Sequence, residues 1–133
     1  MLSKVLDFTN KRINSTLGQI GQHLNESDKY PHVKQTHIEE LKAFIGLLYF
    51  RGLYCLNNHK TNILFSERFG IPVFGACMSR QRFEFLMAHI CFDEIASRPE
   101  RWQHDRFAAI RYFFEDCNKN FAKALVPEDY LSL

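Results

Sequence analysis

The sequence predicts a mainly α-helical fold, a compact domain of about four to six helices. Three observations predict it. Apolar residues recur at spacings of three and four in four segments of the chain, as they do on one face of a helix. Helix-start and helix-stop residues stand at the ends of these segments. The 133 residues are 46% hydrophobic and include 13 phenylalanines, which is enough apolar volume for the core of one domain.

The first predicted helix ends near Gly21. Its apolar residues are Leu2, Val5, Leu6, Ile13, Leu17 and Ile20. Their spacing places them on one helical face. The polar stretch NESDKYPH at 25–32 follows, and Pro31 within it indicates a loop.

The second predicted helix has the clearest start. Thr36 and Glu39 match a capping box, in which the threonine hydroxyl accepts from the glutamate amide and the glutamate side chain reaches back. The apolar residues that follow are Ile38, Leu41, Phe44, Ile45, Leu47, Leu48, Tyr49 and Phe50. They cover the helix nearly all round, so we expect it to lie in the middle of a bundle. Asn57 and Asn58 then lead into a loop.

Residues 62–92 predict a short amphipathic piece followed by a longer helix. Gly70, Pro72 and Gly75 interrupt the first part, and Ser79 is the expected N-cap of the helix. The predicted buried stripe of that helix consists of Phe83, Leu86, Met87 and Ile90. These spacings again follow the helical period.

The last predicted helix runs from about residue 105 to 124, after a charged loop at 97–105. Its expected buried face consists of Phe107, Ile110, Phe114, Cys117 and Phe121. Pro127 ends it. Glu128 and Asp129 are typical of a linker, and Tyr130, Leu131 and Leu133 are typical of the start of a buried strand. We therefore expect a helical domain at 1–127 and the first residues of a further unit at 128–133.

Charge and cysteine content limit the function classes only loosely. The formal net charge is +2 and the pI is about 8.4, which is mildly basic and does not decide the partner. The N-terminal residues lack the pattern of a signal peptide, so we expect the four cysteines to be reduced and mostly packed. The longest apolar stretch, 43–50, is too short to span a membrane.

The motifs of catalysis and metal binding are missing from this sequence. Cys55 with His59 and His89 with Cys91 do not have zinc-site spacing, so we interpret them as core cysteines and surface histidines. No nucleophile elbow and no glycine-rich phosphate loop occur. We therefore predict no catalytic residue, no metal site and no cofactor.

Residues 80–111 are rich in arginine. The six arginines are Arg80, Arg82, Arg98, Arg101, Arg106 and Arg111. Trp102 and His104 stand among them, a mixture that suits phosphate contacts beside an aromatic platform. Five acidic residues nearly cancel the positive charge, so composition alone favours an ordinary surface of ion pairs.

Five stretches, in order, resemble the N-terminal part of the piggyBac transposase family and its transposase-derived relatives. They are VLDFTNKR (5–12), HIEELKAFIGLLYFRGLY (37–54), MSRQRFEFLMAHICFDE (78–94), DRFAAIRYFFEDCNKNF (105–121) and VPEDYLSL (126–133). Together they cover nearly the whole chain.

The resemblance implies a function in addition to a fold. In the family this region is a helical dimerisation and DNA-binding part, and the first catalytic aspartate of a ribonuclease-H-like core follows the last matched stretch. It therefore implies that this chain lacks the catalytic acidic triad and is not an enzyme by itself. It also implies a nuclear protein, otherwise a cytoplasmic one. The implied partners are double-stranded DNA of transposon ends, and a second copy or a related transposase-derived protein.

Four arginines lie in the matched stretches. By the resemblance, Arg80, Arg82, Arg106 and Arg111 are the expected phosphate contacts. Arg82 and Arg111 fit equally well as buried ion pairs that hold helices together. The alternative function is a helical protein–protein interaction module that does not bind DNA.

Overall fold

The structure is a computed structural model that describes residues 1–20 and 30–124. Within those ranges it contains helices and no strand. The elements are α1 (Leu2–Ile20), α2 (Ile38–Leu53), the short 3-10 helix η1 (Leu56–Asn58), α3 (Thr61–Leu64), α4 (Pro72–Cys77), α5 (Arg80–His89), α6 (Arg98–His104) and α7 (Arg111–Ala124). The mainly helical prediction is confirmed. The seven α-helices of the described part exceed the predicted number because several are short. The predicted strand start and its domain boundary lie outside the described residues.

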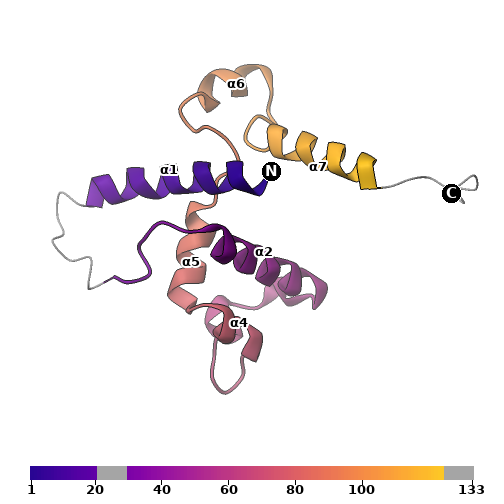
Figure 1. Ribbon diagram of the computed structural model, residues 1–133. Helices are drawn as coiled ribbons and strands as arrows, with labels where there is room; N and C mark the ends of the chain where they lie inside the picture. Colours follow the sequence, from indigo (N-terminus) through magenta and orange to yellow (C-terminus); the bar gives the residue numbers. More distant parts are fainter. Residues whose placement is uncertain (21–29, 125–133) are drawn as a thin grey trace, which may run out of the picture.

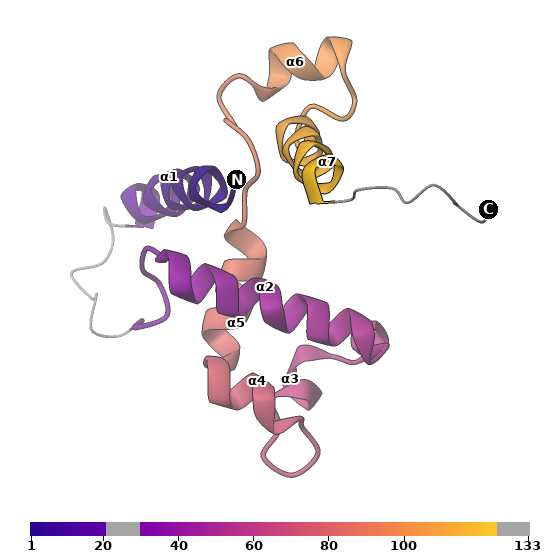
Figure 2. The same ribbon diagram turned by 45° about the vertical axis from the view of Figure 1, so that its right-hand side comes forward.

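The helices form a central group with an extension at each end (Figures 1 and 2). Helix α5 runs through the middle, and α1 and α2 both cross it. At one end of α5 lie α3 and α4, which contact α5 and α2 respectively. At the other end the chain passes α1 and continues into α6 and α7. This arrangement separates the start of α5 from α6 and α7.

Phenylalanine rings fill the core between α2, α4 and α5. The rings of Phe44, Phe65 and Phe74 surround Phe83, with centroids 5.3, 5.5 and 6.2 Å from its own. The buried cluster consists of Val5, Leu41, Phe44, Leu47, Leu64, Phe74, Phe83 and Leu86. Such tilted and edge-on ring pairs add to the stabilisation from apolar burial. Some of the phenylalanines of the chain therefore form this core.

The predicted capping box of α2 is wrong. The helix begins at Ile38, and no side chain caps its first turn. Thr36 is buried, and its hydroxyl donates instead to the carboxylate of Glu40 at 2.8 Å. The side-chain amide of Asn10 on α1 bonds the backbone N–H and C=O of Thr36, both at 2.9 Å. A contact between α1 and the start of α2 therefore replaces the local cap.

Helix α5 begins as the sequence predicts. The Ser79 hydroxyl oxygen accepts a hydrogen bond from the Arg82 amide at 3.2 Å, as an N-cap does. Phe83 and Leu86 are buried, whereas Met87 is exposed, so the predicted stripe is narrower than expected. The whole of α5 has 10 residues, and its short apolar face fits between α2 and α3.

The apolar surface of α2 is not covered all round. Tyr49 and Leu53 are each 79% exposed, which contradicts the predicted central position inside a bundle. The buried residues of α2 are Leu41, Phe44 and Leu47 on the opposite face. The neighbours of α2 are α1, α4, η1 and, through Phe44 and Phe83, α5, and none of them covers Tyr49 and Leu53.

The last predicted helix begins later than expected, and a different face of it is buried. Residues 98–104 form α6, where the sequence predicted a loop, and α7 begins only at Arg111. Its predicted buried residues Phe107, Ile110, Phe114 and Phe121 are exposed. The side that meets α1 instead carries Phe113, which packs against Phe92, and Asp116, which pairs with Lys4 at 3.4 Å. The packing of Phe113 against Phe92, together with this ion pair to α1, orients α7.

The four cysteines are free, and their expected packing is wrong for two of them. Cys91 is buried and Cys117 is half-buried, but Cys55 and Cys77 are exposed. Cys55 follows the end of α2 in the left-handed conformation, with φ of 55°. Among the described helices none has the length and apolar content that a membrane span requires.

Candidate nucleic-acid interface

The guanidinium of Arg82 is buried between α5, α2 and the segment before α2. It donates to both carboxylate oxygens of Glu40 at 2.8 Å and to the backbone oxygens of His32, Lys34 and Gln35 at 2.7–3.0 Å. All five of its N–H donors are therefore engaged within the chain. The hydrogen bonds from Arg82 are the largest cause that holds the pKa of Glu40 below its usual value. Of the two roles left open by the sequence, this geometry is that of a buried ion pair.

Arg80, by contrast, is an exposed residue of the first turn of α5. Its Nε atom lies 3.9 Å from a Glu84 oxygen, at the limit of an ion pair, and both side chains are about half exposed. A pair of this kind contributes little to stability. Arg80 therefore has donors available for another ligand.

A second buried cluster surrounds Asp93, between α1 and α6. The Asp93 side chain is 1% exposed and receives hydrogen bonds from Arg98 and from Arg101, the latter at 2.8 Å. Burial raises the pKa of Asp93, but the hydrogen bonds and charges of the two arginines outweigh it and lower the pKa below its usual value. Arg101 also donates to the Ala108 carbonyl oxygen at 2.9 Å and so ties α6 to the segment before α7.

Sequence reasoning missed the structural roles of two acids, the partly buried Glu40 and the buried Asp93. The signal for Asp93 was weak: an acid followed five and eight residues later by arginines, across a predicted loop. For Glu40 no local signal existed, because its partner Arg82 is 42 residues away. Long-range ion pairs of this kind become visible only when the packing is known.

Arg111 pairs with Asp105 at the start of α7. Its Nε and Nη2 atoms donate to the two carboxylate oxygens of Asp105, each at 2.8 Å. The hydrogen bonds from Arg111, and then the one from the Phe107 amide, lower the pKa of Asp105 to about 2. The guanidinium also lies over the Phe107 ring, 5.3 Å from its centroid. The pair is partly exposed, so it fixes the turn before α7 without burying the charge.

Arg106 has a different partner from the other predicted arginines. Its guanidinium lies over the indole of Trp102, 4.3 Å from the ring centroid, and Trp102 is 51% exposed. No carboxylate of the described ranges pairs with it. A stacked guanidinium keeps its N–H edges available while its position is held. Arg106 therefore presents an unneutralised, ordered positive charge at the surface.

The structure does not gather the four predicted arginines into one site. Arg82 lies inside the central group and Arg80 at the start of α5, whereas Arg106 and Arg111 belong to the region around α6 and α7 (Figure 2). We call Trp102, His104, Arg106 and Arg111 the α6–α7 surface. Two of these residues, His104 and Arg111, line a hollow of about 280 Å³, and the stacked pair of Arg106 and Trp102 lies outside its lining. The residues that line this hollow are Arg101, His104, Asp105, Ala108, Arg111, Tyr112 and Glu115.

The residues considered as metal ligands lie apart or are engaged with other groups. The His89 ring stacks on Phe85, and the Cys91 thiol donates to the Asp93 carbonyl oxygen at 3.2 Å. Within residues 1–20 and 30–124, no three histidine, cysteine, aspartate or glutamate side chains gather where they could hold a metal ion.

Comparison with protein families supplies the observation that decides the family. The model of the family described as Transposase IS4, the piggyBac-type family, matches residues 1–133. The chain belongs to the Transposase IS4 family. The predicted resemblance is confirmed at the level of the family. No curated protein and no solved structure matches the chain.

Membership of the Transposase IS4 family links the chain to proteins that associate with DNA. Of the arginines in its matched stretches, Arg106 is stacked and unneutralised, Arg80 is loosely paired, and Arg82 and Arg111 are engaged with carboxylates. The α6–α7 surface is therefore the candidate nucleic-acid interface of this Transposase IS4 chain.

Proposed function

We propose that this chain is a helical DNA-binding module of the Transposase IS4 family that has no catalytic activity of its own. Its ligand is the phosphate backbone of double-stranded DNA, as at transposon ends, and its working location is the nucleus. The observation that carries the proposal is Arg106, a positive charge held on an exposed tryptophan without a carboxylate partner in the described part. Family membership supports DNA as the partner.

The charge balance around Arg106 supports a phosphate ligand. Between residues 98 and 111 the sequence has four arginines and two acids. Two of these arginines share Asp93, so the segment together with Asp93 carries a net charge of +1. Local positive charge of this kind supplies most of the sequence-independent affinity for DNA. Trp102 adds an aromatic face on which a sugar or base edge can pack.

The other three predicted arginines have different roles. Arg111 donates two of its N–H groups to Asp105, so it supports the surface and adds a partly neutralised charge. Arg80 is a separate, exposed phosphate contact at the other end of α5. Arg82 acts as a positioning residue, since its donors are used within the chain.

Three carboxylates of the described part are held by arginines. Glu40, Asp93 and Asp105 each accept hydrogen bonds from arginine. A carboxylate held in this way is a poor ligand for a catalytic metal ion, because its charge is already neutralised.

Replacement of Arg106 tests the proposal directly. We expect Arg106→Ala to weaken binding to a double-stranded oligonucleotide, measured by fluorescence anisotropy at several salt concentrations. The slope of log affinity against log salt should fall by about 0.9, as for one lost phosphate contact. Trp102→Ala should weaken binding in the same direction, because Arg106 loses its support.

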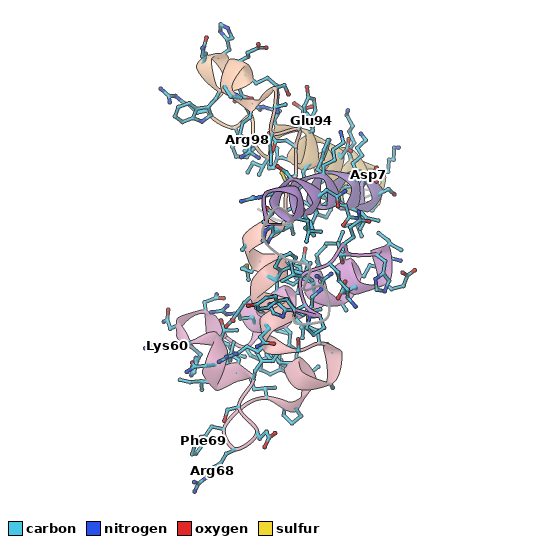
Figure 3. All side chains as sticks on the ribbon, turned by 90° about the vertical axis from the view of Figure 1, so that its left-hand side faces the viewer. Asp7, Lys60, Arg68, Phe69, Glu94 and Arg98 are labelled. Atoms are coloured by element: carbon cyan, nitrogen blue, oxygen red, sulfur yellow. The ribbon has the colours of Figure 1, made fainter. Side chains whose placement is uncertain are left out.

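Arg68 provides the matched control. Its guanidinium also lies over an exposed aromatic ring, that of Phe69, at 5.1 Å. Figure 3 shows both residues on the loop at the end of the molecule opposite to Arg98. Arg68→Ala removes the same charge and the same kind of stacking at a distant place. Equal losses for Arg68→Ala and Arg106→Ala would contradict a defined interface.

A helical protein–protein interaction module without DNA binding is the second candidate function. The exposed apolar face of Phe107, Ile110, Phe114 and Phe121 favours it. Exposed apolar patches of this kind mark protein interaction sites. Added salt weakens DNA binding steeply and leaves apolar association nearly unchanged, so a salt titration separates the two functions.

A further inference from the structure

Three arginine–aromatic stacks lie close together in the chain, between residues 101 and 112. The pairs are Arg101 with Tyr112, Arg106 with Trp102 and Arg111 with Phe107, and the guanidiniums lie 5.7, 4.3 and 5.3 Å from the ring centroids. The other cation–π contacts of the described residues are spread over α1, α5 and the loop after α3. The region of α6 and α7 therefore combines guanidiniums and aromatic rings more densely than the rest of the described chain.

Two of these rings keep an open face. Trp102 is 51% exposed and Tyr112 is 55% exposed. Because a guanidinium lies over one face of each ring, exposure of this size leaves the opposite face to solvent. Phe107 differs from them, since it is 37% exposed and the Phe114 ring meets it at right angles, with centroids 5.5 Å apart. The arginines thus hold Trp102 and Tyr112 in place while one face of each ring stays available.

An open aromatic face beside positive charge suits an unpaired nucleobase. The bases of a continuous duplex are stacked on one another, so their faces are closed to a protein. An unpaired base can stack on an aromatic side chain, and such stacking is typical of proteins that bind single strands. A surface that contacted only the phosphates of a duplex would need the guanidiniums but not the open rings.

We infer that the α6–α7 surface binds DNA that carries unpaired nucleotides, whose bases stack on Trp102 and on Tyr112 beside it. The inference rests on the proposed function and names the form of DNA that this surface prefers. That form is a duplex with a single-stranded extension, in preference to a continuous duplex. Arg106, stacked on the other face of Trp102, contacts the phosphate next to the first base.

The hollow beside Tyr112 supplies donors for the second nucleotide. His104 and Arg111 line it together with Tyr112. Arg111 uses its Nε and Nη2 atoms for Asp105, and its Nη1 atom takes no part in that pair. This Nη1 group and the His104 ring are therefore placed to donate to the phosphate of a nucleotide whose base lies on Tyr112. Asp105 and Glu115 line the same hollow, so the preference for an unpaired nucleotide comes from stacking more than from charge.

Trp102 itself reports the inferred stacking. It is the single tryptophan of the chain, so tryptophan emission arises at this surface alone. Three DNA probes are titrated into the full chain: a blunt duplex, the same duplex with a single-stranded thymidine extension, and the same duplex with an equally long extension of abasic sites. The two extensions carry the same phosphates and differ only in their bases. We expect the thymidine extension to quench the Trp102 emission and to bind about tenfold more tightly than the abasic one.

Two substitutions at Tyr112 separate a base platform from a merely structural role. Tyr112→Phe keeps an aromatic face and should keep the preference for the thymidine extension, whereas Tyr112→Ala should remove much of it. Phe69→Ala is the matched control and should keep the full preference. Phe69 is 72% exposed and is also stacked with an arginine, but it belongs to a distant loop (Figure 3). Circular dichroism melts verify that each variant folds.

Three results would overturn the inference. The first is equal affinity for the thymidine and the abasic extension, and the second is binding of the thymidine extension without quenching of Trp102. The third is an equal loss of the preference in Tyr112→Ala and Phe69→Ala. A chain that binds the blunt duplex through Arg106 but does not distinguish the two extensions refutes this inference and leaves the proposed function intact. A chain that binds none of the three probes refutes both.

Discussion

At the scale of single residues, the arginines of this chain differ by the group that each one meets. Arg82 is surrounded by a carboxylate and three backbone carbonyls, whereas Arg106 meets only a tryptophan ring in the described part. The sequence places both in similar arginine-rich stretches, and it does not reveal which is structural. The acids Glu40 and Asp93, through their positions in the fold, decide which arginines remain available for phosphate.

Arg82→Lys should destabilise the fold strongly. A lysine ammonium cannot make the five hydrogen bonds by which the Arg82 guanidinium connects Glu40 to three backbone oxygens, so buried acceptors lose their donors. We expect a loss of about 3 kcal/mol in the free energy of unfolding, as for a broken buried pair. Urea denaturation followed by circular dichroism measures it.

Arg80→Lys is the control for this change. Arg80 is exposed two positions away on the same helix, and its ion pair is long, so the substitution should change the unfolding free energy by less than about 0.5 kcal/mol. Similar losses in the two variants would show that Arg82 has no special structural role.

At the scale of elements, α6 differs from the central helices because it has no buried residue of its own. Its position depends on Arg98 and Arg101, which reach back from α6 to Asp93. Because α6 also carries Trp102, the Asp93 cluster links the folded core to the candidate interface. A change at Asp93 should therefore affect α6 and α7 before it affects α2 and α5.

Asp93→Asn should loosen α6 selectively. The substitution keeps the shape of the side chain but removes the charge that two half-buried guanidiniums share, so we expect a loss of about 2 kcal/mol. Hydrogen exchange should accelerate in residues 98–111 and remain slow in α2. Glu94→Gln is the neighbouring control, because Glu94 pairs with Lys11 only at the exposed surface. Uniform acceleration across all helices would contradict the selective effect.

The elements that could be predicted from the sequence are those determined by local patterns. The N-cap at Ser79 and the helices around it required only neighbouring residues. The exposed face of α7 could not be predicted, because the helix packs through Phe113 against Phe92 and through Asp116 against Lys4, which is 112 residues away. The same is true of Thr36, whose expected capping role is replaced by bonds to Asn10. For the candidate site, the family motifs predicted which arginines to consider. Only the packing showed that Arg82 is engaged within the chain and that Arg106 is available for a ligand.

At the scale of the whole molecule, arginine–carboxylate pairs join elements both within the apolar core and beyond it. Glu40 with Arg82 connects α2 to α5, Asp93 connects α6 to the core, and Asp105 with Arg111 fixes the start of α7. The fold should therefore depend on pH more than its apolar core alone would suggest.

We expect stability to decrease as the pH falls below about 5. Glu40, Asp93 and Asp105 all have lowered pKa values in the folded chain, to about 2 for Asp105, against about 4 in an unfolded chain. Between these values the unfolded chain binds more protons, so acid favours unfolding. The contribution is fully present at neutral pH and is lost as the pH falls from about 5 toward 2. Urea midpoints measured between pH 7 and pH 3 test this.

The double variant Glu40→Gln with Asp93→Asn separates these pairs from general acid denaturation. It should be less stable at pH 7 and should lose less further stability between pH 7 and pH 3 than the wild-type chain, because two of the three depressed carboxylates are gone. Glu39→Gln with Glu94→Gln removes the same number of charges from exposed neighbours and should keep the wild-type pH profile. If the Glu40→Gln, Asp93→Asn variant lost as much stability between pH 7 and pH 3 as the wild-type chain, other carboxylates would be responsible for the acid response.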